Sequence, residues 1–238
     1  MKTSASSSYN SLQTSLQHNS KYAEFLLGYT YGQSIDNSSG QADNTNVFNP
    51  RLSRGLSNFD VTHNFVVSYT IQLPFNQLVG KSGWAEYLTK GWSVSGITTF
   101  ASGLPVTMVE NDDNSLTGTN ADLPSYDPTM GKLAGNHNPR KAGAYFNTAL
   151  FSQEPFGQFG NSRRRFFHGP GLNNTDVALL RKFDFTERTY LQFRLESFNV
   201  FNHVQFKTPS GNWNSSSFGF VTAANDPRIL QVALKLYF

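Results

Sequence analysis

Apolar and polar residues alternate along the last ten positions of the chain, from Ile229 to Phe238. Because successive side chains of a strand point to opposite faces, this pattern predicts a strand with one apolar face and one mixed face. The apolar face carries Leu230, Val232, Leu234, Leu236 and Phe238. Two interpretations stay open from these residues alone: an edge strand of a soluble sheet, or the last strand of a closed membrane barrel.

Six further segments alternate in the same way. They are residues 9–17, 22–34, 58–73, 92–101, 174–183 and 189–201. Most of them have the roughly 9–11 residues that a tilted membrane strand needs. The sequence therefore predicts an all-β fold, an antiparallel transmembrane β-barrel segment of about seven to eight long strands with long extracellular loops.

The connections between these segments alternate in length. Short or medium connections are expected at 18–21, 74–91 and 184–188, and long loops at about 35–57, 102–173 and 204–227. Short periplasmic turns that alternate with long outer loops are typical of bacterial outer-membrane barrels. Such single-chain barrels have even strand numbers, and residues 1–20 lack the pattern of a signal peptide. We therefore expect residues 1–238 to be the C-terminal part of a larger barrel, with the signal peptide absent.

Composition and charge agree with a barrel wall. Hydrophobic residues make up only 38% of the chain, yet aromatic residues reach 14%, which suits one lipid face, a polar lumen and wet loops. The net charge of +3 is spread along the chain, so no basic stripe for nucleic acid is expected. The chain has no cysteine, which excludes disulfides and thiolate metal sites.

Several segments together resemble a known family. They are YNSLQTSL, YTYGQSIDNSSG, FNPRLSRGLSNFDVTHNFVVSYTIQLPF, GWSVSGITTFASGLPVT, TERTYLQFRLESFNVFNHVQF and the final LKLYF. This set is similar to the C-terminal barrel portion of TonB-dependent receptors, and most of all to the Oar-like group, whose members carry a carboxypeptidase-regulatory-like domain.

The resemblance implies a location in the outer membrane of a Gram-negative bacterium, in contact with outer-membrane lipid. It implies that the plug domain of the parent protein is absent from these residues. It also implies that the parent protein takes up an unknown substrate and contacts the TonB system only through missing N-terminal parts. It also implies that the barrel-assembly machinery recognises the C-terminal strand, with Leu234, Leu236 and Phe238 as the assembly signal.

The alternation assigns candidate residues to each face. The lumen-facing candidates are Asp176, Lys182, Arg194 and Glu196. They either contact a plug or a polar solute, or form a charge network that satisfies only itself. The lipid-facing candidates are Phe65, Val67, Tyr69, Leu191, Phe193 and Leu195.

The loops offer weaker signals. Asp112, Asp113 and Asn114 provide oxygen ligands, but their spacing does not match a calcium loop, so we expect no metal site. Arg163 to Arg165 are interpreted either as a solvated cluster or as a site for anionic lipopolysaccharide. No nucleophile elbow, phosphate loop or paired histidines occur, so we expect neither a cofactor nor an enzyme. A small self-contained structural or adhesive barrel and a soluble all-β binding module stay as alternatives.

Overall fold

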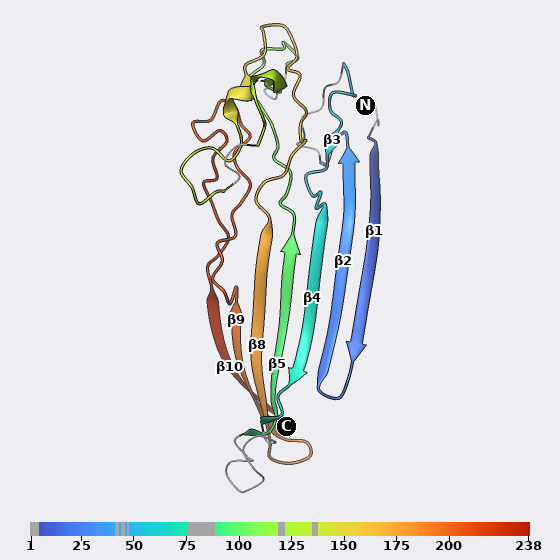
Figure 1. The fold of residues 1–238 in the computed structure, drawn as a ribbon, viewed down its shortest axis with the longest axis vertical. Coiled ribbons are helices and arrows are strands. Elements are labelled where there is room, and N and C mark those ends of the chain that lie inside the picture. Colours follow the sequence, from blue (N-terminus) through green and yellow to red (C-terminus); the bar gives the residue numbers. More distant parts are fainter. Residues whose placement is uncertain are drawn as a thin grey trace.

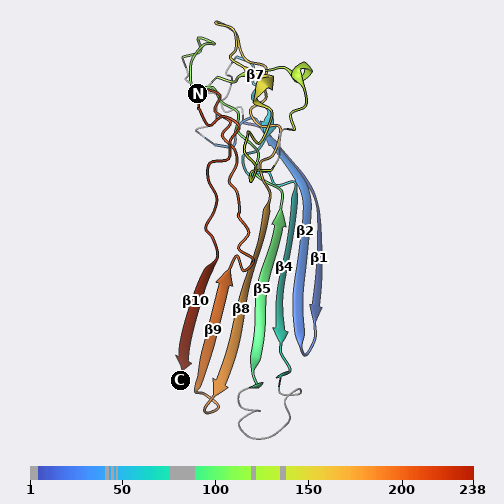
Figure 2. The ribbon, with the colours of Figure 1, turned by 60° about the vertical axis from the view of Figure 1, so that its left-hand side comes forward.

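The computed structural model describes residues 5–40, 43, 46, 48–75, 89–118, 122–134 and 138–238. Its main element is an antiparallel sheet of eight strands in the order β1-β2-β4-β5-β8-β9-β10, with the short β3 (Gly55–Leu56) paired to β2. The long strands are β1 (Ser7–Asn19), β2 (Ala23–Asp36), β4 (His63–Gln72), β5 (Trp92–Ala101), β8 (Leu172–Asp184), β9 (Tyr190–Phe198) and β10 (Ile229–Tyr237). Each long strand lies beside its neighbour in the chain, and Figures 1 and 2 show β1 and β10 at opposite edges. The predicted antiparallel all-β fold is confirmed.

The two ends of the sheet differ in the amount of chain they carry. The described residues of the connections 37–62, 102–171 and 199–228 lie at the end with the N-terminus, which we call the loop end (Figure 1). The described residues of the connections 20–22, 73–91 and 185–189 lie at the opposite end, with the C-terminus, which we call the turn end. The longest connection also contains β6 (Ser125–Tyr126), β7 (Phe151–Ser152) and the 3-10 helices η1 (Pro128–Met130) and η2 (Thr148–Leu150).

Two predicted strand boundaries were wrong, each for a local reason. The fourth strand begins at His63 and not at residue 58, because the Asp60 carboxylate turns back and accepts a hydrogen bond of 2.5 Å from the Ser34 backbone N–H. The strand predicted over 189–201 ends at Phe198, because Asn199 adopts a left-handed φ of 52° that leaves the extended conformation.

The strand register divides the sheet into two faces. On one face Phe65 of β4 lies opposite Tyr29 of β2 and Phe100 of β5. Tyr69, four residues further on, lies opposite Gly96, where an added Cβ would come within 2.5 Å of the tyrosine hydroxyl. The glycine thus leaves room for the ring on this face. The opposite face carries mostly small or polar residues, such as Ser68, Thr70 and Ser95.

No buried hydrophobic side chain comes from the seven long strands, within the described residues. The apolar side chains of β10 are instead open, and Phe238 is 97% exposed. The sheet is therefore a single layer with no dry interior against a second layer. A single wall with one exposed apolar face is what a membrane barrel requires and what a soluble sandwich avoids.

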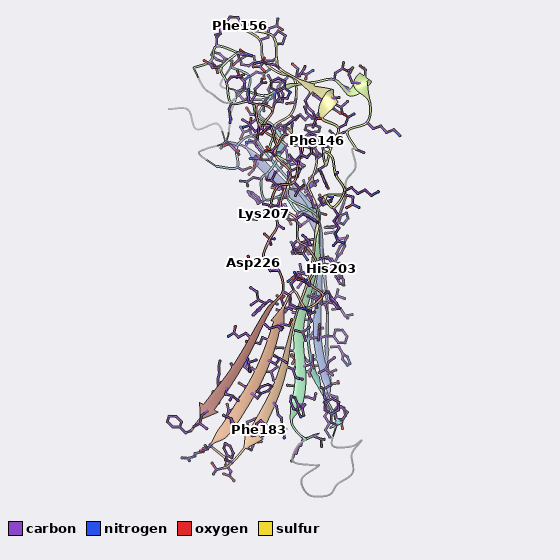
Figure 3. All side chains as sticks on the ribbon, turned by 90° about the vertical axis from the view of Figure 1, so that its left-hand side faces the viewer. Phe146, Phe156, Phe183, His203, Lys207 and Asp226 are labelled. Atoms are coloured by element: carbon purple, nitrogen blue, oxygen red, sulfur yellow. The ribbon has the colours of Figure 1, made fainter. Side chains whose placement is uncertain are left out.

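The hydrophobic core of the protein lies in the loops. It consists of Val106, Met108, Tyr145, Phe146, Leu150 and Phe151, and we call it the loop core. The ring of Phe146 meets those of Phe151, Phe167 and Phe218 edge to face, at centroid distances of 5.6, 5.0 and 5.3 Å. Figure 3 shows Phe146 within the loop assembly and Phe183 at the far end of the sheet. Our expectation of wet, irregular loops was wrong for this region.

Candidate functional site

The polar face of the sheet is hollowed near its middle. The hollow is lined mainly by residues from β2, β4, β5, β8 and β9 that share this face: Glu24, Leu26, Ser68, Thr70, Ser95, Ile97, Asp176, Ala178 and Glu196. Asp176 and Glu196, two of the lumen-facing candidates, thus line one concavity. Arg194 and Lys182 share their face further toward the turn end. Exposure of this face to a water-filled lumen stays a prediction.

The four lumen-facing candidates do not form one network. Arg194 and Glu196 form an ion pair along β9. Lys182 pairs instead with Asp184 at 2.7 Å, near the turn end. Asp176 accepts hydrogen bonds from the Asn174 side-chain amide at 2.9 Å and the Asn199 backbone N–H at 2.8 Å. The charges therefore satisfy themselves locally, and Asp176 helps fix the turn that ends β9.

The six lipid-facing candidates lie together on the opposite face. Leu191, Phe193 and Leu195 of β9 lie opposite Leu236, Leu234 and Val232 of β10. Phe65, Val67 and Tyr69 occupy the same face of β4. Contact of these residues with lipid, and recognition of Leu234, Leu236 and Phe238 by the assembly machinery, stay predictions.

Arg181 and His63 lie on the apolar face, and both are accommodated by aromatic rings. The guanidinium of Arg181 lies 4.0 Å from the ring centre of Phe183 and 5.2 Å from that of Trp92. The Tyr29 hydroxyl lies 2.9 Å from Nδ1 of His63, within hydrogen-bonding distance. The His63 ring also packs against the ring of Tyr31. Both sites lie near an end of the sheet, where a membrane wall meets the interface.

The arginine run in the longest loop is buried rather than solvated. Arg164 forms ion pairs with Asp36 at the end of β2 and, at 2.7 Å, with Asp43 of the first long loop. Arg165 pairs with Asp43 at 2.6 Å and donates from its Nε to the Thr107 hydroxyl at 2.7 Å. Arg164 and Arg165 are therefore neither a solvated cluster nor a lipopolysaccharide site, and both predictions were wrong for them. Their charges are paired with Asp36 and Asp43 inside the protein. Of the three, Arg163 is the one that is exposed.

A second buried contact joins the same loops. His168 Nε2 lies 2.9 Å from the Asp60 carboxylate, whose other oxygen accepts from the Ser34 backbone. Together with the arginine pairs, this contact anchors the 102–171 connection to the 37–62 connection. The arginine pairs position the loops precisely, because each partner would be left buried and unpaired if a loop moved.

Three carboxylates gather within the loop assembly. One oxygen from each of Glu110, Asp112 and Glu154 lies within 4.8 Å of the others. Burial, then the adjacent Glu154 carboxyl and the charges of the neighbouring carboxylates, raise the pKa of Glu110 from 4.5 to about 9. We call Glu110, Asp112 and Glu154 the acidic cluster.

The acidic cluster is not the set that the sequence indicated. Asp113 is occupied as a turn former, because its carboxylate accepts from the backbone N–H groups of Thr117 and Gly118 at 2.7 and 3.0 Å. Asp112 alone belongs to both sets. Glu110 and Glu154 were missed, since they are far apart in the sequence and neither lies in a recognisable motif.

Residues 1–231 match the family model of the outer membrane beta barrel domain. A search of curated proteins found no match. Within the part of the chain that the structure describes, no helix has both the length and the apolar character to cross a membrane. The match, together with the single-layer sheet, supports an outer-membrane wall and disfavours the soluble binding module.

Proposed function

Because the chain belongs to the outer membrane beta barrel domain family and lies in the outer membrane, we propose that it forms part of the wall of a TonB-dependent receptor of the Oar-like group. The parent receptor takes up a solute across the outer membrane with energy delivered through TonB. In this proposal the loop end faces the exterior and the turn end faces the periplasm, and the chain is a wall and gate rather than an enzyme.

Two features of the sheet together support the proposal: it has one apolar and one polar face, and its edge strands β1 and β10 are unpaired on their outer sides in the described residues. In the described residues, β1 pairs only with β2, and β10 pairs only with β9. Unpaired backbone groups are costly in lipid, so a membrane sheet must close. We therefore propose that further strands of the receptor pair with both edges, and that the plug and the TonB contact belong to those other parts.

The polar face supports a role in transport. The hollow over Asp176 and Glu196 is open and partly charged, as expected for a lumen that holds a plug or admits a polar solute. The packed loops lie at the loop end of the sheet, where β2, β5 and β9 have their C-terminal ends (Figure 2). A rigid loop assembly in that place is suited to select what enters.

The proposal is tested on the protein in its native outer membrane. Antibodies raised against residues 102–171 are used to follow the polypeptide on gels with and without heating, and formaldehyde is used to join it to TonB in energised cells. We expect a heat-modifiable polypeptide much larger than the 26.5 kDa of this chain, together with an adduct that disappears when TonB is deleted. A folded 26.5 kDa species without a TonB adduct would contradict the receptor and support the small self-contained structural or adhesive barrel.

A further inference from the structure

The acidic cluster joins loop segments that are distant in sequence. The backbone N–H of Glu110 donates to the Asp122 carbonyl at 2.7 Å, and Val109 exchanges backbone hydrogen bonds with Gly211 and Trp213 at 3.1 and 2.9 Å. Glu154 approaches from another part of the longest loop. Phe156, two residues after it, lies at the tip of the loop assembly, far from the strands (Figure 3).

The carboxylates are buried without donors. Glu110 is 0% exposed and Glu154 is 3% exposed. All four of their carboxylate oxygens, and Oδ1 of Asp112, are buried and lack a hydrogen-bond donor among the described residues. No arginine, lysine or histidine pairs with them in that part of the chain. Leaving charged groups buried and unpaired is strongly unfavourable, so something must neutralise them.

Asp112 is held in position for a ligand on its free side. Its Oδ2 accepts hydrogen bonds from the side-chain amides of Gln153 at 2.9 Å and Asn214 at 3.5 Å. These contacts hold Oδ2 and leave Oδ1 buried without a hydrogen-bond donor among the described residues. Amide donors that orient a carboxylate in this way are typical of the groups behind metal ligands.

We propose that Glu110, Asp112 and Glu154 bind a calcium ion that fastens the outer loops to one another. All the ligand atoms are oxygens, which hard cations prefer. Oxygens that surround calcium at 2.3–2.6 Å lie at most about 4.6–5.2 Å apart, and the three atoms here lie within 4.8 Å of one another. Magnesium demands near-ideal octahedral geometry and usually keeps several of its waters, so a buried cluster of three carboxylates suits calcium better.

A proton shared between Glu110 and Glu154 is the competing way to remove the excess charge. It neutralises one of three carboxylates and leaves most of the unpaired oxygens without a partner. Calcium contacts all three residues at once. The proposal does not depend on whether the barrel transports a solute.

The test uses the intact protein in isolated outer membranes. Trypsin cleavage of the loops is followed in EGTA, in calcium and in magnesium, for the wild type and for Glu110→Gln and Glu154→Gln. Glu187→Gln is the matched control, because Glu187 is exposed in the turn between β8 and β9 at the other end of the sheet. Terbium luminescence, with calcium and magnesium as competitors, measures binding to the purified protein.

Calcium at ten times its dissociation constant should slow loop cleavage about tenfold in the wild type and the control. The two cluster variants should lose this response, and in EGTA they should resist trypsin better than the wild type, because a repelling charge has been removed. The proposal is overturned if calcium leaves wild-type cleavage unchanged, if the variants keep the calcium response, or if magnesium protects equally. Where a variant fails to assemble, displacement of terbium from the wild type by calcium and not by magnesium decides the question.

Discussion

Arg164 and Asp36 form an ion pair although they lie 128 positions apart in the sequence. Their side chains are only 1% and 4% exposed. The contact places the end of β2 directly under the longest loop. Because Arg165 and Asp43 extend the same network, the first two long loops form one packed body above the sheet.

Replacement of Arg164 should loosen this body. Arg164→Ala leaves Asp36 buried without its cation, and breaking such a pair costs about 3–5 kcal/mol. We expect the loops to become sensitive to protease while the sheet keeps its heat-modifiable mobility on gels. Arg163→Ala, at an exposed neighbouring position, should have almost no effect. Equal sensitivity in the two variants would show that the buried pair does not fix the loops.

Acid should loosen the same contact. Burial alone would raise the pKa of Asp43, but hydrogen bonds from Arg165 and the Ser39 backbone, with the charges of Arg165 and Arg164, hold it below 3.8. The folded state therefore binds fewer protons here than the unfolded state. The stabilisation is present above pH 3.8 and is lost as the pH falls through the lowered pKa. Protease sensitivity of the loops should rise in that range, and Asp43→Asn should remove this part of the pH dependence.

The loop core should be as sensitive to truncation as the core of a soluble domain. Phe146→Ala removes a ring that packs against three others, which costs about 3–5 kcal/mol. We expect rapid cleavage within residues 102–171 and an unchanged wall. Phe156→Ala is the control, because that ring is exposed. If Phe146→Ala loops resist protease as the wild type does, the loop core does not hold them.

The two faces of β4 should respond differently to a charge. Val67→Lys places a cation on the predicted lipid face near the middle of the strand, where it costs about 2–4 kcal/mol. Ser68→Lys places the same cation on the polar, hollowed face and should be mild. The fraction of heat-modifiable protein recovered from outer membranes measures assembly. Similar losses for both variants would contradict the assignment of the faces.

The strands were predictable because their signal is local. Alternation at every second residue is visible in a single segment, and the register then keeps Val67, Leu27 and Leu16 on one face across three strands. The boundaries were less predictable. Asp60 and Asn199 end or delay strands through hydrogen bonds and backbone angles that depend on neighbours elsewhere.

The loop assembly was not predictable from local pattern. Its aromatic residues have no fixed period, so Tyr145, Phe146 and Phe167 looked like scattered apolar residues in a polar region. Likewise, Arg164 looked solvated because its partners, Asp36 and Asp43, lie in an earlier loop. Charge and hydrophobicity identify such residues as unusual, but only the folded chain shows which ones meet.

In the proposed orientation, with the loop end outside the cell, the loop core has a consequence for how this end of the protein is recognised. Since the loops hold their own shape around Phe146, antibodies and bacteriophages will meet a surface composed from segments that are separated in the chain. Short synthetic peptides copied from one loop will not reproduce that surface, so a vaccine antigen based on this end has to present the loops folded together.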